Sequence, residues 1–339
     1  MGSIRRRSSL AVPAALALVL AACGDGGGTD GGGAGGGGDA AVQSLQIIVP
    51  ADPGGGWDQT GRAMQQVLQD EELVSDAQVV NVGGAGGTVG LAQLATETNP
   101  DTLMVMGYVM VGAIETNQAQ TTLEDVTPIA RLTDEPLVVV APAERPYEDV
   151  TDLIDDIRQN GQGVAVTGGS AGGADHILAA QLLTESGVPA EDVAGTLNYI
   201  PYSGGGESLA ALLGNNVNAG ISGVGEYAEQ VEAGALKALA VSGAERSPAL
   251  PDVPTLGEQG IDLVLTNWRG VVAPGSVDDA QAEALTTLVT DMHDTEAWSA
   301  VLEQNNWGDA FLAGPEFAEF LSQETEETRE TLRTIGLVQ

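Results

Sequence analysis

The 339-residue chain is 43% hydrophobic, which is enough for a large buried core and favours two domains. Its formal net charge is −36 at pH 7, and Lys237 is its only lysine. Such a chain cannot build the basic stripes that hold phosphate backbones, so nucleic acid is excluded as a partner. The acidic excess instead favours a well-solvated surface suited to a salty or acid-tolerant habitat.

The N-terminal segment predicts export. Three arginines at 5–7 precede a short apolar run at 10–20, which is followed by Leu20-Ala21-Ala22-Cys23. This order is typical of a signal peptide, here residues 1–22. The tetrapeptide resembles the bacterial lipobox, which implies lipidation of Cys23, the only cysteine. The alternative is an ordinary secretory signal that leaves a free cysteine.

Residues 24–38 are mostly glycine and carry no large apolar side chain. They cannot bury enough surface to offset the entropy of ordering, so a flexible tether is expected. We therefore assign 23–44 to a lipidated cysteine and a glycine-rich tether. Such a segment would hold the protein on the outer face of the cell membrane, in the periplasm or outside the cell.

From Leu45 onward, short apolar runs alternate with segments of helical periodicity. The expected strands are 45–50, 78–82, 102–106, 137–141, 163–167, 198–200, 218–221, 238–242 and 270–273. The expected helices are 59–69, 89–98, 150–160, 174–186, 207–213 and 226–233, with further helices from Asp278 on. This alternation predicts an α/β protein with two mostly parallel sheets.

Two apolar strands end at a proline, in PLVVVAP at 136–142 and RGVVAP at 269–274. If these are the crossings between domains, residues 45–142 and 267–339 form lobe I, and residues 143–266 form lobe II. Small ligands of α/β proteins bind in such inter-domain clefts, so a cleft between the lobes is the expected binding site.

Four glycine-rich stretches follow expected strands and open expected helices. They are DPGGGWD at 52–58, GGAGGTVG at 83–90, GGSAGGADH at 168–176 and YSGGGES at 202–208. The N–H groups at a helix N-terminus attract anions, and glycine lets an anion come close to the backbone. No loop has the lysine of a phosphate-binding P-loop or the spacing of a dinucleotide fingerprint. The four loops together favour a site for a small polyanion.

Longer stretches, including VPADPGGGWDQTGRAM at 49–64 and ALAVSGAERSPALPDVPT at 238–255, resemble the substrate-binding proteins of tripartite tricarboxylate transporters, the TctC or Bug family. The resemblance runs from about residue 45 to 339. It implies a two-lobed type 2 periplasmic-binding-protein fold, or Venus flytrap, without catalytic residues or a cofactor. It also implies a monomer that hands a carboxylate to membrane permease subunits. PGGGWD with SGGGES is most similar to citrate-type members, which favours a citrate-like tricarboxylate.

The resemblance, carried over position by position, places backbone N–H groups and hydroxyls around the ligand. On lobe I the implied contacts are Gly55, Gly56, Trp57, Asp58, Ala85, Gly86 and Gly87. On lobe II they are Ser170, Gly172, Ser203, Gly204, Gly205, Gly206 and Ser222. Arg269, a rare cation in the returning strand, joins the set because a guanidinium can hold a carboxylate bidentately.

Three of these residues have structural alternatives. Asp58 either accepts a hydrogen bond from a ligand hydroxyl or caps helix 59–69 and pairs with Arg62. Trp57 either walls the pocket or packs against the opposite lobe. Arg269 either binds ligand or forms a surface or inter-lobe salt bridge.

The rival hypothesis is a secreted serine esterase, because residues 168–172 satisfy G-x-S-x-G around Ser170 between a strand and a helix. The triad would need His293, since His176 lies on the helix that follows Ser170. With only these two histidines, the spacing supports no metal site. The second lobe is explained without catalysis, so a binding protein is favoured over an enzyme.

Overall fold

The computed structural model describes residues 42–202 and 205–338, which fall in one compact unit. The expected signal peptide (1–22), Cys23 and nearly all of the tether (23–44) lie outside the described residues, as do Ser203 and Gly204. Within the described ranges, no helix has the length and apolarity to cross a membrane.

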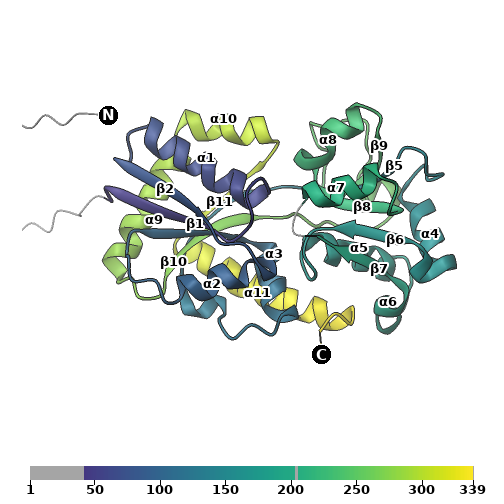
Figure 1. The fold of residues 1–339 in the computed structure, drawn as a ribbon, viewed down its shortest axis with the longest axis horizontal. Coiled ribbons are helices and arrows are strands. Elements are labelled where there is room, and N and C mark those ends of the chain that lie inside the picture. The colour runs from purple at the N-terminus through teal and green to yellow at the C-terminus, as the bar shows by residue number, and fades with distance from the viewer. Residues whose placement is uncertain (1–41, 203–204, 339) are drawn as a thin grey trace, which may run out of the picture. The chain divides into compact units, whose positions relative to one another are not determined.

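The first sheet has six strands in the order β11-β4-β10-β3-β1-β2 (Figure 1). Their bounds are β1 Ser44–Val49, β2 Asp76–Asn81, β3 Thr102–Gly107, β4 Val126–Asp134, β10 Arg269–Pro274 and β11 Gly308–Ala313. β1 runs parallel to β2 and β3, whereas β10 is antiparallel to β3 and β4. Every residue of β3 and β10 is buried, as expected of strands covered by helices on both faces.

The second sheet has five strands in the order β7-β6-β8-β5-β9. Their bounds are β5 Leu137–Pro142, β6 Ala165–Gly168, β7 Asn198–Pro201, β8 Ala219–Gly223 and β9 Leu236–Val241. β6 is parallel to β7 and β8, and β5 is antiparallel to β8 and β9. The α/β class with two sheets is therefore confirmed, and in each sheet most strands run in one direction: β1, β2, β3 and β4 in the first, and β6, β7, β8 and β9 in the second. Each sheet is nevertheless mixed, because β10 and β11 in the first sheet and β5 in the second run against the other strands.

Helices link most of these strands. Their bounds are α1 Gly56–Asp70, α2 Thr88–Leu94, α3 Tyr108–Thr116, α4 Val150–Asn160, α5 Ala174–Glu185, α6 Ala190–Thr196, α7 Gly205–Leu213, α8 Val224–Glu232, α9 Asp279–His293, α10 Glu296–Asn305 and α11 Pro315–Thr334. Short 3₁₀ turns occupy Ala85–Gly87, Leu123–Asp125, Gly161–Gly163 and Gly257–Gln259. Helices α4, α9 and α10 are capped by Asp149, Asp278 and Thr295, whose side chains each accept a backbone N–H from the first turn.

The chain passes between the sheets twice, from β4 to β5 and from β9 to β10. The two crossing segments pair side by side: Pro136 and Thr266 form an antiparallel bridge, and Asn267 N–H donates to the Glu135 carbonyl oxygen at 2.8 Å. The sequence assigned 137–142 to lobe I, but β5 pairs with strands of the second sheet. The first crossing therefore lies just before β5, at Glu135–Pro136, because β5 supplies the centre of that sheet. The remaining lobe limits stay predictions.

Candidate ligand-binding site

The first glycine loop turns into α1 over Gly54, Gly55 and Gly56. Gly54 has φ of +101°, a conformation that side chains other than glycine rarely adopt, and Gly55 occupies the N-cap position. Gly56 and Trp57 lie in the first turn of the helix. A Cβ at Gly56 would lie 2.5 Å from Nη2 of Arg269, so a larger residue there would displace the guanidinium.

Asp58 is buried beneath this loop and holds it by hydrogen bonds. The residue is 4% exposed, and its Oδ2 accepts from Gly54 N–H and Arg62 Nε, each at 2.9 Å, while Oδ1 accepts from Asn81 Nδ2 at 2.9 Å. Burial alone would raise the pKa of Asp58, but the hydrogen bonds from Arg62, Asn81 and Gly54 together lower it. The expected Asp58–Arg62 pair is present, whereas the expected capping role is wrong because Gly55 is the N-cap. Both carboxylate oxygens serve the loop, which favours a structural role over a ligand contact.

Trp57 packs within its own lobe. A Cβ on Gly87 would lie 2.8 Å from the Trp57 ring, and a Cβ on Gly107 would lie 3.3 Å from its Nε1. The indole therefore fits between the second glycine loop and the end of β3, where small residues leave it room. This contact differs from the expected packing against the opposite lobe, and the role of pocket wall stays a prediction.

The second glycine loop carries a run of left-handed residues before α2. Gly84, Ala85, Gly86 and Gly87 have φ of 133°, 50°, 62° and 91°. The loop faces lobe II, since a Cβ on Gly86 would lie 3.7 Å from Cβ of Ser170. Next to this contact, the Thr116 hydroxyl, which donates to the Gly112 carbonyl at 3.0 Å, lies 3.4 Å from the Ala171 carbonyl oxygen. The loops at 85–87 and 170–172, far apart in sequence, thus meet between the two sheets.

The third loop uses several of its own N–H groups. Gly169 N–H donates to Asp175 Oδ2 at 2.6 Å, and Gly172 N–H donates to His176 Nδ1 at 3.1 Å. The His176 ring stacks on Tyr199 with centroids 4.1 Å apart, and burial lowers the pKa of His176 to about 4, which keeps the ring neutral. The Gly172 N–H was expected to bind ligand, but it is already bonded inside the protein.

Part of the fourth loop is described. Gly205 and Gly206 open α7, and a Cβ on Gly206 would point into open space. Ser222, at the end of β8, is buried, and its Oγ donates to Glu226 Oε2 at 2.9 Å. The Ser222 hydroxyl therefore orients a carboxylate of α8, a contact that its position in the sequence did not indicate.

Arg269 forms a buried salt bridge. Its Nη2 lies 2.6 Å from Oε2 of Glu135, and the two side chains are 3% and 2% exposed. Glu135 Oε1 also accepts the Gly225 N–H at the start of α8, at 2.9 Å, and Arg269 stacks over the Trp307 ring at 4.9 Å. Arg269 therefore forms a salt bridge, as the structural alternative predicts, but the bridge is buried and its partner Glu135 lies in a crossing segment. Nη1 of Arg269, however, is buried and has no hydrogen-bond partner among residues 42–202 and 205–338.

A small cavity of 110 Å³ opens beside this salt bridge. Arg269, Glu135 and Glu226 line it, together with Gln59 of α1 and Asn306 in the turn that follows α10. Burial raises the pKa of Glu226, as does the nearby Glu135 charge, while Ser222 and Arg269 act in the opposite direction. Sequence reasoning missed Glu135 and Glu226, because each stands alone without a motif.

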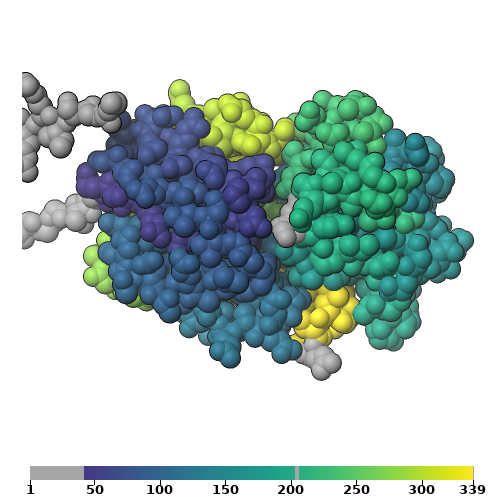
Figure 2. All heavy atoms as spheres, in the orientation of Figure 1, coloured from purple at the N-terminus to yellow at the C-terminus, as the bar shows by residue number. Residues whose placement is uncertain are grey.

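Figure 2 shows the N-terminal residues, purple to blue, meeting the green middle of the chain along a seam.

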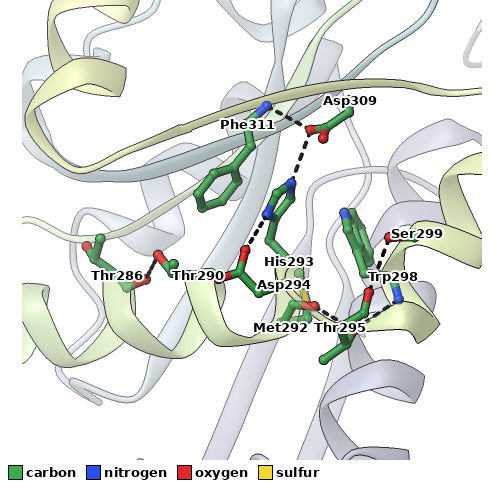
Figure 3. Close-up of polar contacts among 10 residues, drawn as sticks. All are labelled: Thr286, Thr290, Met292, His293, Asp294, Thr295, Trp298, Ser299, Asp309 and Phe311. Atoms are coloured by element: carbon green, nitrogen blue, oxygen red, sulfur yellow. Dashed lines mark hydrogen bonds and ion pairs between the residues drawn. The ribbon is translucent and has the colours of Figure 1, made fainter.

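Both histidines that an esterase triad could use are bonded to other residues. His293 lies on α9, where its Nδ1 and Nε2 are each 3.1 Å from a carboxylate oxygen, of Asp294 and Asp309 respectively, and its ring stacks on Phe311 (Figure 3). His176 Nδ1 is taken by Gly172. Among residues 42–202 and 205–338, no group of three histidine or acidic side chains could hold a metal ion.

Two mixed α/β sheets, joined by paired crossing segments and with glycine loops meeting between them, define a two-domain protein of the periplasmic-binding-protein type. The family model for the tripartite tricarboxylate transporter family receptor, TctC, matches residues 62–337, and the chain belongs to this family.

Individual relatives agree with this assignment. Protein BugT of Bordetella pertussis is 31% identical over 240 residues, covering 69% of this chain and 71% of that protein. A UPF0065 protein from the TAR-I ttuE-ttuC' intergenic region of Agrobacterium vitis is 30% identical over 258 residues, covering 73% and 71%.

Solved structures share the fold. Rpa4515 of Rhodopseudomonas palustris, solved with adipate, superimposes with a TM-score of 0.78 at 21% identity, covering 88% of this chain and 99% of that one. MatC of the same organism, with bound malate, gives a TM-score of 0.73 at 22% identity and the same coverage.

Proposed function

We propose that this chain is an extracytoplasmic solute-binding lipoprotein that captures a small carboxylate between its lobes and delivers it to the permease of a tripartite tricarboxylate transporter. A citrate-like tricarboxylate is the favoured ligand. The observation that carries the proposal is the meeting of the loops at 85–87 and 170–172 between the two sheets of a TctC-family receptor. Relatives of the same fold that were solved with malate and adipate support a carboxylate ligand.

A thermal-shift screen of the soluble domain against mono-, di- and tricarboxylates tests the binding function. A ligand at 100 times its Kd is expected to add about 2.7 kcal/mol to the free energy of unfolding. Ser170→Ala should weaken that ligand by about 1 kcal/mol, the size of one lost hydrogen bond, and Ser299→Ala on α10 serves as the control. A panel in which no carboxylate shifts the unfolding temperature would contradict the proposal.

The lipid anchor depends on Cys23, which lies outside the described residues. Cys23→Ser is expected to move the protein from the membrane pellet to the soluble fraction and leave ligand affinity unchanged, because a flexible tether separates the anchor from the site. Fractionation after a carbonate wash measures the first effect, and calorimetry on the released protein measures the second. A variant that stays in the pellet would rule out lipidation of Cys23.

A further inference from the structure

The cavity beside the Arg269–Glu135 salt bridge lies between elements of the two sheets. Gln59 and Asn306 border it from α1 and from the turn after α10, and Glu226 borders it from the first turn of α8. Its 110 Å³ is room for several water molecules, or for one polar group of a ligand, since one water needs about 10–15 Å³. The cavity is therefore large enough to take part in recognition.

The cavity is lined by two carboxylates, of Glu135 and Glu226, and by the Arg269 guanidinium, and Glu135 is already bonded to Arg269 and Gly225. Arg269 is 2% exposed, and its buried Nη1 has no hydrogen-bond partner in the described part of the chain, which is costly for a charged group unless something accepts from it. Glu226 presents a carboxylate that Ser222 Oγ holds by a 2.9 Å hydrogen bond. A group that both accepts a hydrogen bond and donates one would satisfy the two side chains together.

Charge decides which group fits. A ligand carboxylate could accept from Arg269 but would face the carboxylates of Glu226 and Glu135, and an ammonium could bond to Glu226 but would face the guanidinium. A hydroxyl is neutral, accepts through its lone pairs and donates its proton. It therefore suits Arg269 Nη1 and Glu226 without a like-charge contact.

The cavity adjoins the first glycine loop. A Cβ on Gly56 would lie 2.5 Å from Arg269 Nη2, so the guanidinium lies directly against the loop that is proposed to hold a ligand carboxylate. Asp58, the residue first considered for a ligand hydroxyl, has both oxygens bonded to its own loop. We propose that the Arg269–Glu226 cavity is a hydroxyl subsite, which selects hydroxylated carboxylic acids over the same acids without the hydroxyl. This inference rests on the proposed carboxylate-binding function.

Isothermal titration calorimetry with matched ligand pairs tests the subsite. Malate differs from succinate, and citrate from tricarballylate, by one hydroxyl group. The wild-type protein is expected to bind the hydroxylated member of at least one pair tenfold or more tightly, the effect of one charge-assisted hydrogen bond. Glu226→Leu should bring that ratio close to one, whereas Glu226→Gln, which keeps an acceptor oxygen, should retain most of it.

Two further variants keep the test specific. Glu229→Leu, at an exposed position on the same helix, should leave the ratio unchanged. Ser222→Ala, which frees the Glu226 carboxylate, should give an intermediate ratio, and it replaces Glu226→Leu if that variant does not fold. Binding of both members of each pair with equal affinity would overturn the hydroxyl subsite and leave the carboxylate function standing. A ratio that survives Glu226→Leu would overturn the role of Glu226, and no heat with any of the four acids would overturn the proposed function itself.

Discussion

Glu135→Leu is expected to lower the free energy of unfolding by about 3–5 kcal/mol, because it leaves the buried Arg269 guanidinium without its counter-ion. The same change removes the acceptor of the Gly225 N–H. Arg269→Met should cost a similar amount, since it leaves the Glu135 carboxylate buried and uncompensated. Chemical denaturation at pH 7 measures both losses.

The double variant Glu135→Leu/Arg269→Met provides the decisive control. Replacing both partners of a buried ion pair by apolar residues removes the uncompensated charge, so the double variant should lose less than either single variant. The Arg246–Glu258 pair, whose side chains are 43% and 46% exposed, is the surface comparison, and Glu258→Leu should have a much smaller effect. Losses that add up in the double variant would show that Glu135 and Arg269 act independently.

The Glu135–Arg269 pair shows what a sequence can and cannot reveal about a site. Arg269 could be singled out from the sequence because cations are rare in this chain and it lies in the returning apolar strand. Its partner lies 134 positions earlier, and only the pairing of the two crossing segments brings them together. No local pattern encodes such a contact, so the choice between ligand contact and salt bridge needed the fold.

Most elements of the fold were predictable because local patterning agrees with tertiary structure. Strands β1, β3 and β10 are short apolar runs between turn residues, and α4 has both a capping aspartate and a clear apolar face. α3 was missed because it is apolar nearly all round, with six of its nine residues buried, so helical periodicity is lost. β4 was missed because Pro128 and Arg131 interrupt its apolar pattern, and β11 because it is a partly exposed edge strand.

The positions of the glycine loops could be predicted from the sequence, but the acceptor of each backbone N–H group could not. The motifs place Gly54 to Gly56 and Gly84 to Gly87 at turns that need left-handed or crowded backbone. Whether an N–H faces a ligand depends on side chains one turn later. Asp58 takes the Gly54 N–H and His176 takes the Gly172 N–H, because each side chain folds back over its own loop.

Asp175 is the second buried acid whose substitution is expected to change the free energy of unfolding strongly. Its carboxylate accepts the Gly169 N–H, and burial raises its pKa to about 7, with the negative charges of Glu226 and Glu135 acting in the same direction and the Gly169 bond and Arg269 opposing them. The hydroxyl-bearing rings of Tyr199 and Tyr227 also lie near this carboxyl. Above pH 7 the folded protein must therefore hold an ionised carboxylate in a site that disfavours it.

The sign of the pH dependence follows from the raised pKa. Between the ordinary value of 3.8 and about 7, the unfolded chain has released the Asp175 proton and the folded protein still holds it, so stability falls as pH rises and levels off above about 7. Asp175→Asn keeps an oxygen for Gly169 but cannot ionise. It should be more stable than the wild type by about 4 kcal/mol at pH 8, with the difference vanishing near pH 4. Unfolding measured from pH 4 to 8 tests this, with the exposed Asp155→Asn on α4 as the control. If the variant is equally stabilised at every pH, or is destabilised at pH 8, Asp175 is ionised in the folded protein over this range. Its hydrogen bond to Gly169, rather than its burial, would then determine its pKa.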